Sequence, residues 1–369
     1  MDTITIRTSE RSTFKRCPQK WYWSYVERLK PHHAANALWF GTAVHEALAE
    51  WYKRGKARGP KPSETFCKSL DEDRSIPVDD PDDQIVYQDA RELGTAMLDN
   101  YLEVYKRDPF WKVIATEMTF QVMIKHPAGF MIRYVGTWDG VYEDLNTGEI
   151  WLMEHKTASV IDTAHLPLDD QAGSYWAVAE EVLRKQGLLK PGQHIAGIMY
   201  NFLKKSRKDD RPVNAEGFVT NKPLKKHYAA AFEAAGVPAS EYSVSKMVIA
   251  ELQFVADRNG ITVYGDPSKE QPAELLVREP VYRSVGERKT QIDRIKNEAI
   301  YMHGIRKGDP AYPVYKTVVQ WGPTACQRCE FFQICQLNEA GDSMEQEMKE
   351  AMYYEWEPYA AHEIEKKSA

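Results

Sequence analysis

The sequence predicts a mixed α/β fold, with a three-strand meander that is flanked by helices and extended by a fourth strand. Three consecutive segments, 113–124, 130–142 and 149–157, are rich in β-forming residues and are separated by glycine-containing turns. A helical pattern of apolar residues follows over 167–185, and a further apolar strand pattern covers 194–203. This succession of helices and strands is typical of a mixed sheet covered by helices.

Helical patterns also precede the meander. Residues 9–28 have apolar side chains at helical spacing, and Pro18 inside this stretch predicts a break in the helix. A second helix is expected over 39–54. An acidic, proline-containing loop over 71–83 then leads into a long helix over 83–105.

The C-terminal half has weaker patterns. The elements expected there are two helices, a strand and a longer helix, at 222–235, 238–259, 274–282 and 285–306. We expect a single domain over 1–340 with a core at about 110–205 and a helical insertion at about 205–270. A cysteine-rich, loop-rich segment follows at 309–336, and residues 341–369 are expected to form a polar helical tail.

Charge is unevenly distributed along the chain. The net charge of −6 argues against a protein that coats DNA through bulk electrostatics, but it does not exclude a local basic surface. Acidic residues dominate 68–92 and basic residues dominate 204–226. The basic segment, with Lys204, Lys205 and Arg207, is either a solvated surface or a ridge that contacts phosphates. The 10 Trp and 20 Tyr residues either thicken the core or stack on bases.

No segment has the features of a secretory signal or of a membrane span. We therefore expect a cytoplasmic protein with no membrane partner. Thiols stay reduced in that compartment, so the five cysteines are better interpreted as ligands than as disulfides.

Two acidic residues and a lysine form the central constellation. Asp139 lies on the second predicted strand and Glu154 and Lys156 on the third, so an antiparallel register can bring them together. Glu154 and Lys156 are two positions apart and share one face of their strand. Carboxylates offer hard oxygen ligands for Mg²⁺ or Mn²⁺, and a lysine can stabilise a charged transition state. An isolated triplet of this kind is more often a surface ion pair.

Four motifs give these residues a context. The segment 40–45 resembles a helix-borne histidine motif, 136–140 a G-x-x-D-G motif, and 154–157 a (D/E)-x-K-T motif. Gln171 and Tyr175 match a Q-x-x-x-Y helix motif. In this order the motifs resemble the PD-(D/E)XK nucleases, and within them the RecB-like exonucleases. The resemblance implies a restriction-endonuclease-like core with helical N-terminal and insertion regions. It also implies a protein of a bacterium or a phage-infected host.

The resemblance covers about residues 9–336 and implies a role for each matching position. Asp139 and Glu154 would be metal ligands, and Lys156 would be the catalytic lysine. His45 would be an additional metal ligand or would position a water, whereas a lone histidine of this kind is more often structural.

The surrounding positions have weaker assignments. Gln171 and Tyr175 would contact DNA or brace the catalytic lysine, unless they are ordinary helix-face residues. Glu117 on the first predicted strand is a candidate acidic ligand, although a strand glutamate usually faces water. His155 points to the opposite face and has no expected catalytic role. Trp138 departs from the aliphatic residue common before the aspartate in this family, and it could affect packing or base contacts.

The cysteines form a second constellation. Cys326, Cys329 and Cys335 have C-x₂-C-x₅-C spacing, and Cys17 lies near the other end of the chain. Four thiolates suit either a [4Fe–4S] cluster or a tetrahedral Zn²⁺. The arrangement resembles the iron–sulfur staple of RecB-like nucleases such as AddB and the CRISPR-associated RecB-type exonucleases, which favours the cluster. Cys67 is expected to be an ordinary thiol.

The resulting functional hypothesis is a DNA exonuclease that uses one or two Mg²⁺ or Mn²⁺ ions, acts on single-stranded ends and serves recombination, repair or DNA processing. The alternative is a catalytically weak iron–sulfur DNA-binding subunit of a recombination or CRISPR-adaptation complex, with protein partners from that complex. A zinc-stapled structural or adaptor protein is a third possibility. Cleavage of labelled single-stranded DNA separates the first hypothesis from the other two.

Overall fold

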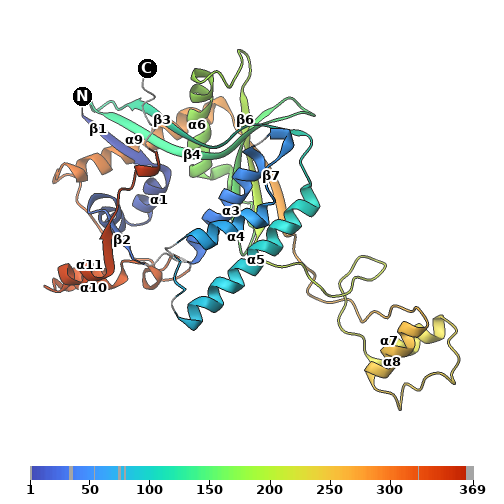
Figure 1. Ribbon diagram of the computed structural model, residues 1–369. Helices are drawn as coiled ribbons and strands as arrows, with labels where there is room; N and C mark the ends of the chain where they lie inside the picture. The colour runs from blue at the N-terminus through green and yellow to red at the C-terminus, as the bar shows by residue number, and fades with distance from the viewer. Residues whose placement is uncertain are drawn as a thin grey trace. The chain divides into compact units, whose positions relative to one another are not determined.

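The structure is a computed structural model of the chain (Figure 1). It describes residues 2–32, 36–53, 55–73, 76–78, 80–322 and 324–362. The chain forms two compact units. The first consists of Met1–Ser206 and Leu276–Ala369, and the second is Arg207–Leu275.

A six-stranded mixed sheet forms the centre of the first unit. Its strands are β1 (Thr3–Arg7), β3 (Trp111–Lys125), β4 (Met131–Asp144), β5 (Ile150–Ala158), β6 (Ile195–Lys204) and β7 (Leu276–Tyr282). The pairs β3–β4 and β4–β5 are antiparallel, which confirms the predicted meander. In contrast, β6 runs parallel to β5, and β7 is antiparallel to β6. The predicted mixed α/β architecture is therefore correct.

The sheet has an opening beside the middle of β4. One edge of β4 pairs with β3 along nearly its whole length. The other edge pairs with β1 over Met131–Val135 and with β5 over Gly140–Glu143. Between these two stretches, no strand of the described chain pairs with that edge of β4. Asp139 lies in this opening, at the point where β4 and β5 separate.

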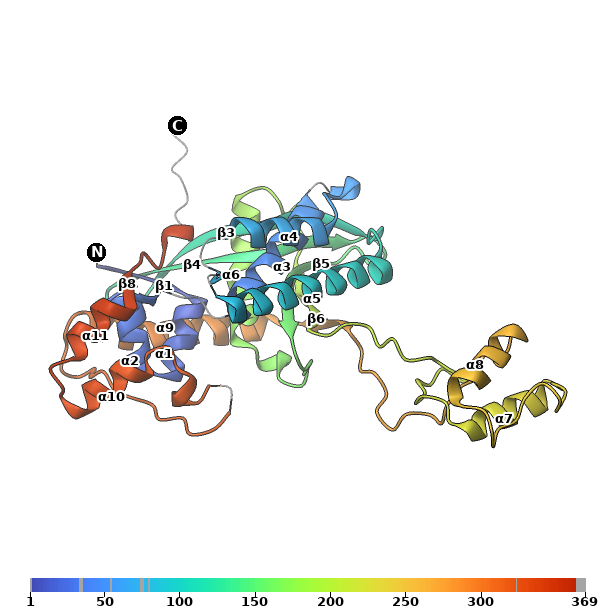
Figure 2. The ribbon, with the colours of Figure 1, turned by 60° about the horizontal axis from the view of Figure 1, so that its bottom comes forward.

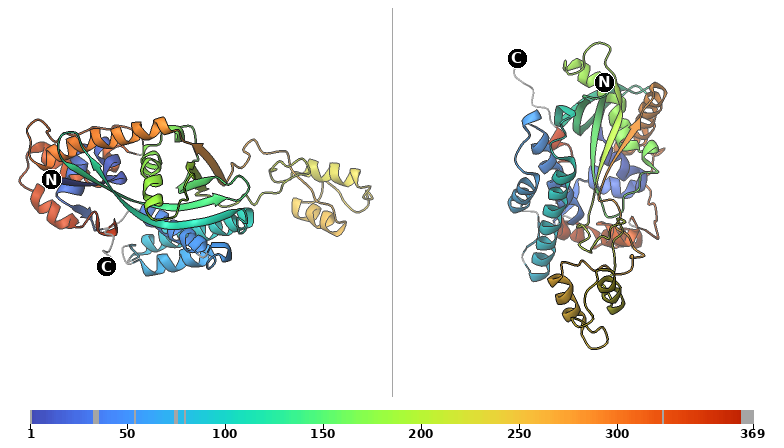
Figure 3. Two further views of the ribbon diagram at one scale, coloured as in Figure 1. Left: turned by 90° about the horizontal axis from the view of Figure 1, so that it is seen from above. Right: turned by 90° about the vertical axis from the view of Figure 1, so that its right-hand side faces the viewer.

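Helices cover both faces of the sheet (Figure 3). One face packs against α3 (Asn36–Lys53), α4 (Pro62–Glu72) and α5 (Pro81–Tyr105), through a core that includes Val44, Leu48 and Leu98. The other face packs against α6 (Asp170–Lys185) and α9 (Val285–Arg306), through a separate core. The predicted helices at 39–54, 83–105, 167–185 and 285–306 are thus present, and they place the sheet in the middle of three layers.

Helix α4 was not predicted from the sequence. Its buried apolar side chains include Phe66 and Leu70, which is a weak helical signal. The helix is held by tertiary contact, since a Cβ atom on Gly94 of α5 would lie 2.2 Å from the Phe66 ring. The close approach of these two helices therefore depends on the missing side chain at position 94.

The two ends of the chain fold against each other (Figure 2). The N-terminal part contains α1 (Thr8–Arg16), α2 (Pro18–Trp21), a π-helical turn (Tyr22–Val26) and β2 (Leu29–Pro31). The C-terminal part contains α10 (Phe332–Ala340), α11 (Glu345–Met352) and β8 (Tyr353–Glu355). Strands β2 and β8 form an antiparallel pair. The C-terminal segment is therefore not simply a polar helical tail, because it contributes a strand to the first unit.

The described residues also include short 3₁₀ helices at Gly55–Ala57, Leu166–Leu168, Cys326–Arg328 and Ala360–His362. Of the helices within the described ranges, none is both long and apolar enough to pass through a lipid bilayer.

The second unit is small and has its own apolar core. It contains α7 (Lys225–Ala234) and α8 (Ile249–Arg258), and its core includes Tyr228, Phe232 and Leu252. The single helix expected over 238–259 was wrong, since only its last part is helical. Residues 238–248 form turns, in which the backbone N–H of Met247 donates to the carbonyl of Ser243. Proline and serine residues in this stretch favour turns over a continuous helix.

A cluster of charges joins α6 to α9. The Glu180 carboxylate lies 2.8 Å from Arg184 and 2.9 Å from Arg288, and His194 also contacts it. Burial alone would raise the pKa of Glu180, but the hydrogen bonds and charges of these partners lower it to about 2. Because the folded pKa lies below that of an unfolded glutamate, this carboxylate stabilises the fold above about pH 5. The stabilisation is lost as the pH falls from about 5 toward 2.

We expect Glu180→Gln to lower the free energy of unfolding by about 1–2 kcal/mol at pH 7, after allowance for solvent screening of the partly exposed arginines. The loss should shrink steadily between pH 5 and pH 3. Urea unfolding at several pH values measures it. Glu181→Gln is the matched control, because Glu181 is an exposed neighbour that pairs with Lys185. A deficit in Glu180→Gln that stays constant with pH would contradict the ionic origin.

Candidate metal centre and cysteine cavity

Asp139 occupies the opening in the sheet and is 9% exposed. Its Oδ2 accepts a hydrogen bond of 2.6 Å from the backbone N–H of His155, a group on β5 just beyond the stretch that pairs with β4. Its Oδ1 lies 3.2 Å from Nδ1 of His45, which reaches the site from α3. The aspartate thus holds a fixed orientation between two strands and a helix.

Glu117 faces the same point from β3. The β3–β4 register pairs Thr116 with Gly140 and Met118 with Trp138, so Glu117 lies across from Asp139. Its backbone has φ of 43°, a left-handed conformation that is unfavourable for a residue with a side chain. Such strain costs on the order of 1–3 kcal/mol and concentrates at functional sites.

Together these residues form a set of possible metal ligands. One ligand atom from each of His45, Glu117 and Asp139 lies within 4.8 Å of the others. Oxygen and imidazole donors of this kind suit divalent cations. Glu154 is not a member of this compact trio.

Glu154 is instead held by Lys156. The Lys156 Nζ lies 2.6 Å from Oε1 of Glu154 and donates to Oε1 of Gln171 at 3.2 Å. The two-residue spacing predicted a shared face for Glu154 and Lys156, and their contact agrees with it. Gln171 on α6 therefore braces the lysine from the helix side, which is one of the two expectations for this residue.

The pKa values show a local excess of negative charge. Burial, with the neighbouring carboxylate of Asp139, raises the pKa of Glu117 to about 7. Burial also raises the pKa of Glu154 to about 7, against the opposing charge of Lys156. Burial would lower the pKa of His45, but Asp139 outweighs this effect and raises it to about 9. The carboxylates thus compete for protons and would gain from a bound cation.

Asp139 differs from the two glutamates. Burial would raise its pKa, but the charge and hydrogen bond of His45 and the N–H of His155 lower it. It is therefore the carboxylate that remains ionised most readily, as a central metal ligand requires.

The site opens to solvent through a cleft of about 480 Å³. Its lining residues are Leu38, Gly41, Thr42, His45, Glu46 and Glu117. Glu46 was not identified from the sequence, although it directly follows His45 on α3. The ligand trio thus lies at the edge of a cleft and not in a sealed interior.

A buried polar network supports the rear of the site. His155 lies on the face of β5 opposite to Lys156, as expected, and its Nδ1 accepts a hydrogen bond of 2.8 Å from Asn201. Asn201 also donates to Tyr101, which is bonded to Arg278 on β7. Sequence reasoning missed Asn201 and Arg278, because only the fold brings them behind β5.

The remaining candidate residues have different surroundings. The ring of Tyr175 packs edge-to-face on Phe120. A Cβ atom on Gly136 would lie 2.7 Å from the Tyr175 ring. Tyr175 is therefore held beneath the opening of the sheet. The Lys205 Nζ lies 4.8 Å from the centre of the Phe40 ring, and burial lowers the pKa of this lysine.

The other two basic candidates lie close by in the chain. Lys204 is the last residue of β6, and Arg207 is the first residue of the second unit. Within the first unit, Lys205 thus contacts the helix that carries His45.

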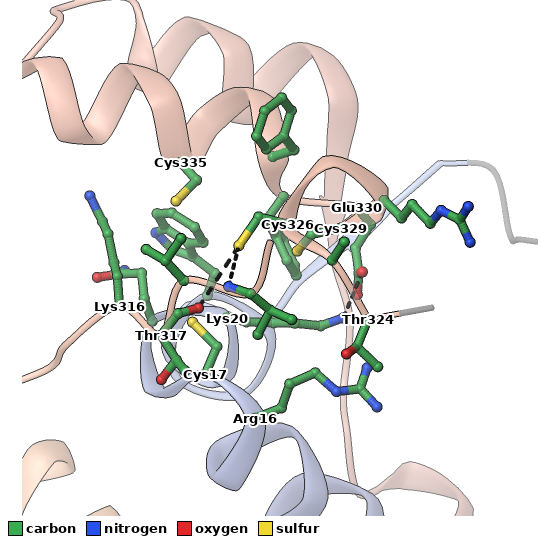
Figure 4. A pocket seen from close by; sticks show the side chains of 18 of the residues that line it. Arg16, Cys17, Lys20, Lys316, Thr317, Thr324, Cys326, Cys329, Glu330 and Cys335 are labelled. Atoms are coloured by element: carbon green, nitrogen blue, oxygen red, sulfur yellow. Dashed lines mark hydrogen bonds and ion pairs between the residues drawn. The ribbon is translucent and has the colours of Figure 1, made fainter. Parts of the chain in front are cut away.

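Four cysteines line one cavity between the two ends of the chain. Cys17 precedes α2, Cys326 and Cys329 flank a 3₁₀ turn, and Cys335 lies on α10. All four line a cavity of about 620 Å³. Figure 4 shows their side chains turned toward a common space. In contrast, the Sγ of Cys67 lies 3.4 Å from the hydroxyl of Thr95, within the α4–α5 layer.

The thiols are close to one another but not tightly clustered. Within the described residues, no three of their Sγ atoms lie within 4.8 Å of each other. The backbone N–H of Val319 donates to the Sγ of Cys326 at 3.3 Å. Burial raises the pKa values of Cys329 and Cys335. A bound metal group would therefore replace protons on buried thiols.

Comparison with known proteins agrees with this geometry. The family model described as the PD-(D/E)XK nuclease superfamily matches residues 8–336. No curated protein matches the chain. The matched segment includes strands β3 to β7, the ligand trio, Lys156 and the four cysteines of the cavity. The chain therefore belongs to the PD-(D/E)XK nuclease superfamily, whose members are nucleases that use divalent metals.

Proposed function

We propose that this protein is a DNA exonuclease of the RecB-like branch, which hydrolyses phosphodiester bonds at single-stranded ends. The observation that supports it best is the meeting of the ligand trio at the edge of an open cleft, with the Glu154–Lys156 pair on the neighbouring strand β5. Hydrolysis of a phosphodiester requires charge neutralisation at phosphorus and a positioned water. Among the described residues, the ligand trio and the Glu154–Lys156 pair would provide both the charge neutralisation and the positioned water.

Each residue has a defined task in this proposal. His45, Glu117, Asp139 and Glu154 would hold one or two Mg²⁺ or Mn²⁺ ions, which supply an activated water and neutralise phosphate charge. Lys156 stabilises the negative charge that develops on the phosphoryl oxygens. Its position is set on both sides, since Glu154 and Gln171 both accept hydrogen bonds from Nζ.

Four further residues would contact the DNA backbone or bases. Lys204 is the last residue of β6, next to the end of β5, and Lys205 comes directly after it. Tyr175 lies under the opening of the sheet. We include Arg207 with the two lysines as a phosphate contact. We treat the first unit as one nuclease domain and the residues from about 205 to 270 as its insertion.

The strained backbone of Glu117 allows a sharp test of its role. Glycine adopts the φ of 43° without a steric cost, so Glu117→Gly should raise the free energy of unfolding by about 1 kcal/mol. The same change removes a ligand and should weaken Mn²⁺ binding by roughly 10-fold or more. Urea unfolding and titration calorimetry measure the two effects.

The control for Glu117→Gly is Glu117→Gln, which keeps the strained backbone and removes only the charge. We expect Glu117→Gln to weaken Mn²⁺ binding without the gain in stability that Glu117→Gly shows. If Glu117→Gly bound Mn²⁺ as the wild type does, Glu117 would not be a ligand.

We propose further that the four cysteines would hold a [4Fe–4S] cluster, which would join segments from both ends of the chain. Tetrahedral Zn²⁺ with Zn–S bonds of about 2.3 Å needs Sγ atoms roughly 3.8 Å apart. No three Sγ atoms of the described cysteines lie within 4.8 Å of one another, and this observation, with the cavity of about 620 Å³, favours a larger group. The N–H of Val319 that donates to Cys326 is the kind of hydrogen bond that tunes cluster sulfurs.

The experiment that tests the nuclease is digestion of end-labelled oligonucleotides by anaerobically purified protein with Mg²⁺ or Mn²⁺. Mononucleotides or short products released progressively from one end support an exonuclease, and separate 5′ and 3′ labels give its polarity. Internal cleavage of circular single-stranded DNA would contradict the exonuclease. Binding without any cleavage would favour a DNA-binding subunit instead.

A further inference from the structure

A second groove lies next to the cleft that His45 and Glu117 line, which is called the metal cleft below. It is a groove of about 870 Å³ between α1, the β2–β8 pair and the segment that carries Arg328. Leu38, which is 59% exposed, lines both this groove and the cleft that contains His45 and Glu117. A chain-like molecule that ends in the cleft could therefore continue into the groove.

The groove has two cations that are available to a ligand. Its nearby carboxylates are already paired, Glu330 with Lys20, Glu355 and Glu357 with Arg28, and Glu27 with Lys349. Lys30 and Arg328 also line the groove, and neither forms an ion pair with a carboxylate of the described residues. The local balance thus favours an anionic ligand.

Aromatic rings surround one of these cations. The Lys30 Nζ lies 6.0 Å from the ring centre of Tyr354 and 5.3 Å from that of Trp356. The His32 ring lies 5.6 Å from the Tyr354 ring.

Strand alternation explains why these rings are available. Tyr353 is buried and stacks on Phe331, so its neighbour Tyr354 points the other way and is 39% exposed. Tyr354 and its cross-strand partner Lys30 thus share the exposed face of the two strands, and His32 and Trp356 follow directly after the strand ends.

We propose that the β2–β8 pair is a platform for the single strand of nucleic acid whose end lies in the metal cleft. This inference rests on the proposed function and adds the path of the substrate. Aromatic side chains stack on unpaired bases, and lysine and arginine contact the phosphates between them. Tyr354, on the exposed face of β8 beside Lys30, supplies a stacking surface, and Lys30 and Arg328, which line the groove, supply phosphate contacts. Bases paired in a duplex do not expose their faces in this way.

The test measures binding in EDTA, so that no cleavage is needed. The probe is a fluorescein-labelled oligothymidylate of about 20 nucleotides, compared with a blunt duplex of the same length by fluorescence anisotropy. Tyr354→Ser should weaken binding of the single strand by roughly 10-fold. Lys30→Gln should reduce the slope of log affinity against log salt by about 0.7. Lys185→Gln, an exposed lysine on α6, should leave both unchanged.

The binding results test the platform independently of whether the protein is a nuclease. In cleavage assays, Tyr354→Ser and Lys30→Gln should raise KM and leave kcat at saturating substrate within about 2-fold of the wild type. Weaker binding by these variants supports the platform even if the wild type cleaves nothing. Wild-type affinity and salt slope in both variants would overturn the platform, whether or not the protein is a nuclease. Equal losses on the duplex would also overturn the preference for a single strand.

Discussion

Replacing Lys156 with alanine should lower kcat on single-stranded DNA by roughly 10²–10⁴-fold. The Nζ of Lys156 is the cation on the catalytic face that both Glu154 and Gln171 orient. Its removal takes away the charge that stabilises the phosphoryl oxygens in the transition state. The fall in kcat is measured on a 5′-labelled oligonucleotide at saturating Mn²⁺ and substrate.

The fold should survive this substitution. Burial already raises the pKa of Glu154 to about 7, so without its lysine this carboxylate can take up a proton. Lys185→Ala is the matched control, since it removes an exposed lysine that pairs only with Glu181 among the described residues. Circular dichroism and the melting temperature confirm folding. A folded Lys156→Ala enzyme with activity within 3-fold of the wild type would reject the catalytic assignment.

The second large effect is expected at the cysteine cavity. Cys329→Ser should abolish the absorbance near about 400 nm that a [4Fe–4S] cluster gives, and it should reduce the iron content. The melting temperature should fall by roughly 5–10 °C, because the cluster would join segments from both ends of the chain. The fold should not be lost completely, since Trp23, Phe331, Ile334 and Tyr353 form an apolar cluster beside the cavity.

Cys67→Ser provides the control for the cysteine prediction. Cys67 lies away from the cavity and contacts Thr95, so the spectrum, the iron content and the melting temperature should change little. Elemental analysis of the anaerobically purified wild type then identifies the metal. If the protein contains zinc and no iron, the four thiols hold Zn²⁺ and not an iron–sulfur cluster. If it contains neither metal, the four thiols have no metal-binding role.

The meander and its flanking helices could be predicted because their signals are local. Strand alternation and turn residues over 113–157 define β3, β4 and β5 without knowledge of their partners. The same alternation placed Glu154 and Lys156 on one face and His155 on the other, as the structure has them. The match of residues 8–336 to the superfamily agrees with motifs that were readable as short patterns.

Short elements could not be predicted, because their stability comes from distant segments. Strand β1 consists of five residues and exists because it pairs with β4, more than a hundred positions away. Strand β8 has three residues that pair with β2 near the other end of the chain. Isolated strands of this length have no intrinsic stability in water, so their sequences carry no reliable signal.

The order of side chains along the chain determined which chemical groups were available: two strand carboxylates, a lysine two positions on, a helix-borne histidine and four thiols. Only the tertiary structure decided how they meet. The separation of β4 from β5 leaves an opening for Asp139, and the left-handed backbone of Glu117 places a further carboxylate within reach of it. These features depend on pairing and packing between segments far apart in sequence, which local periodicity does not encode.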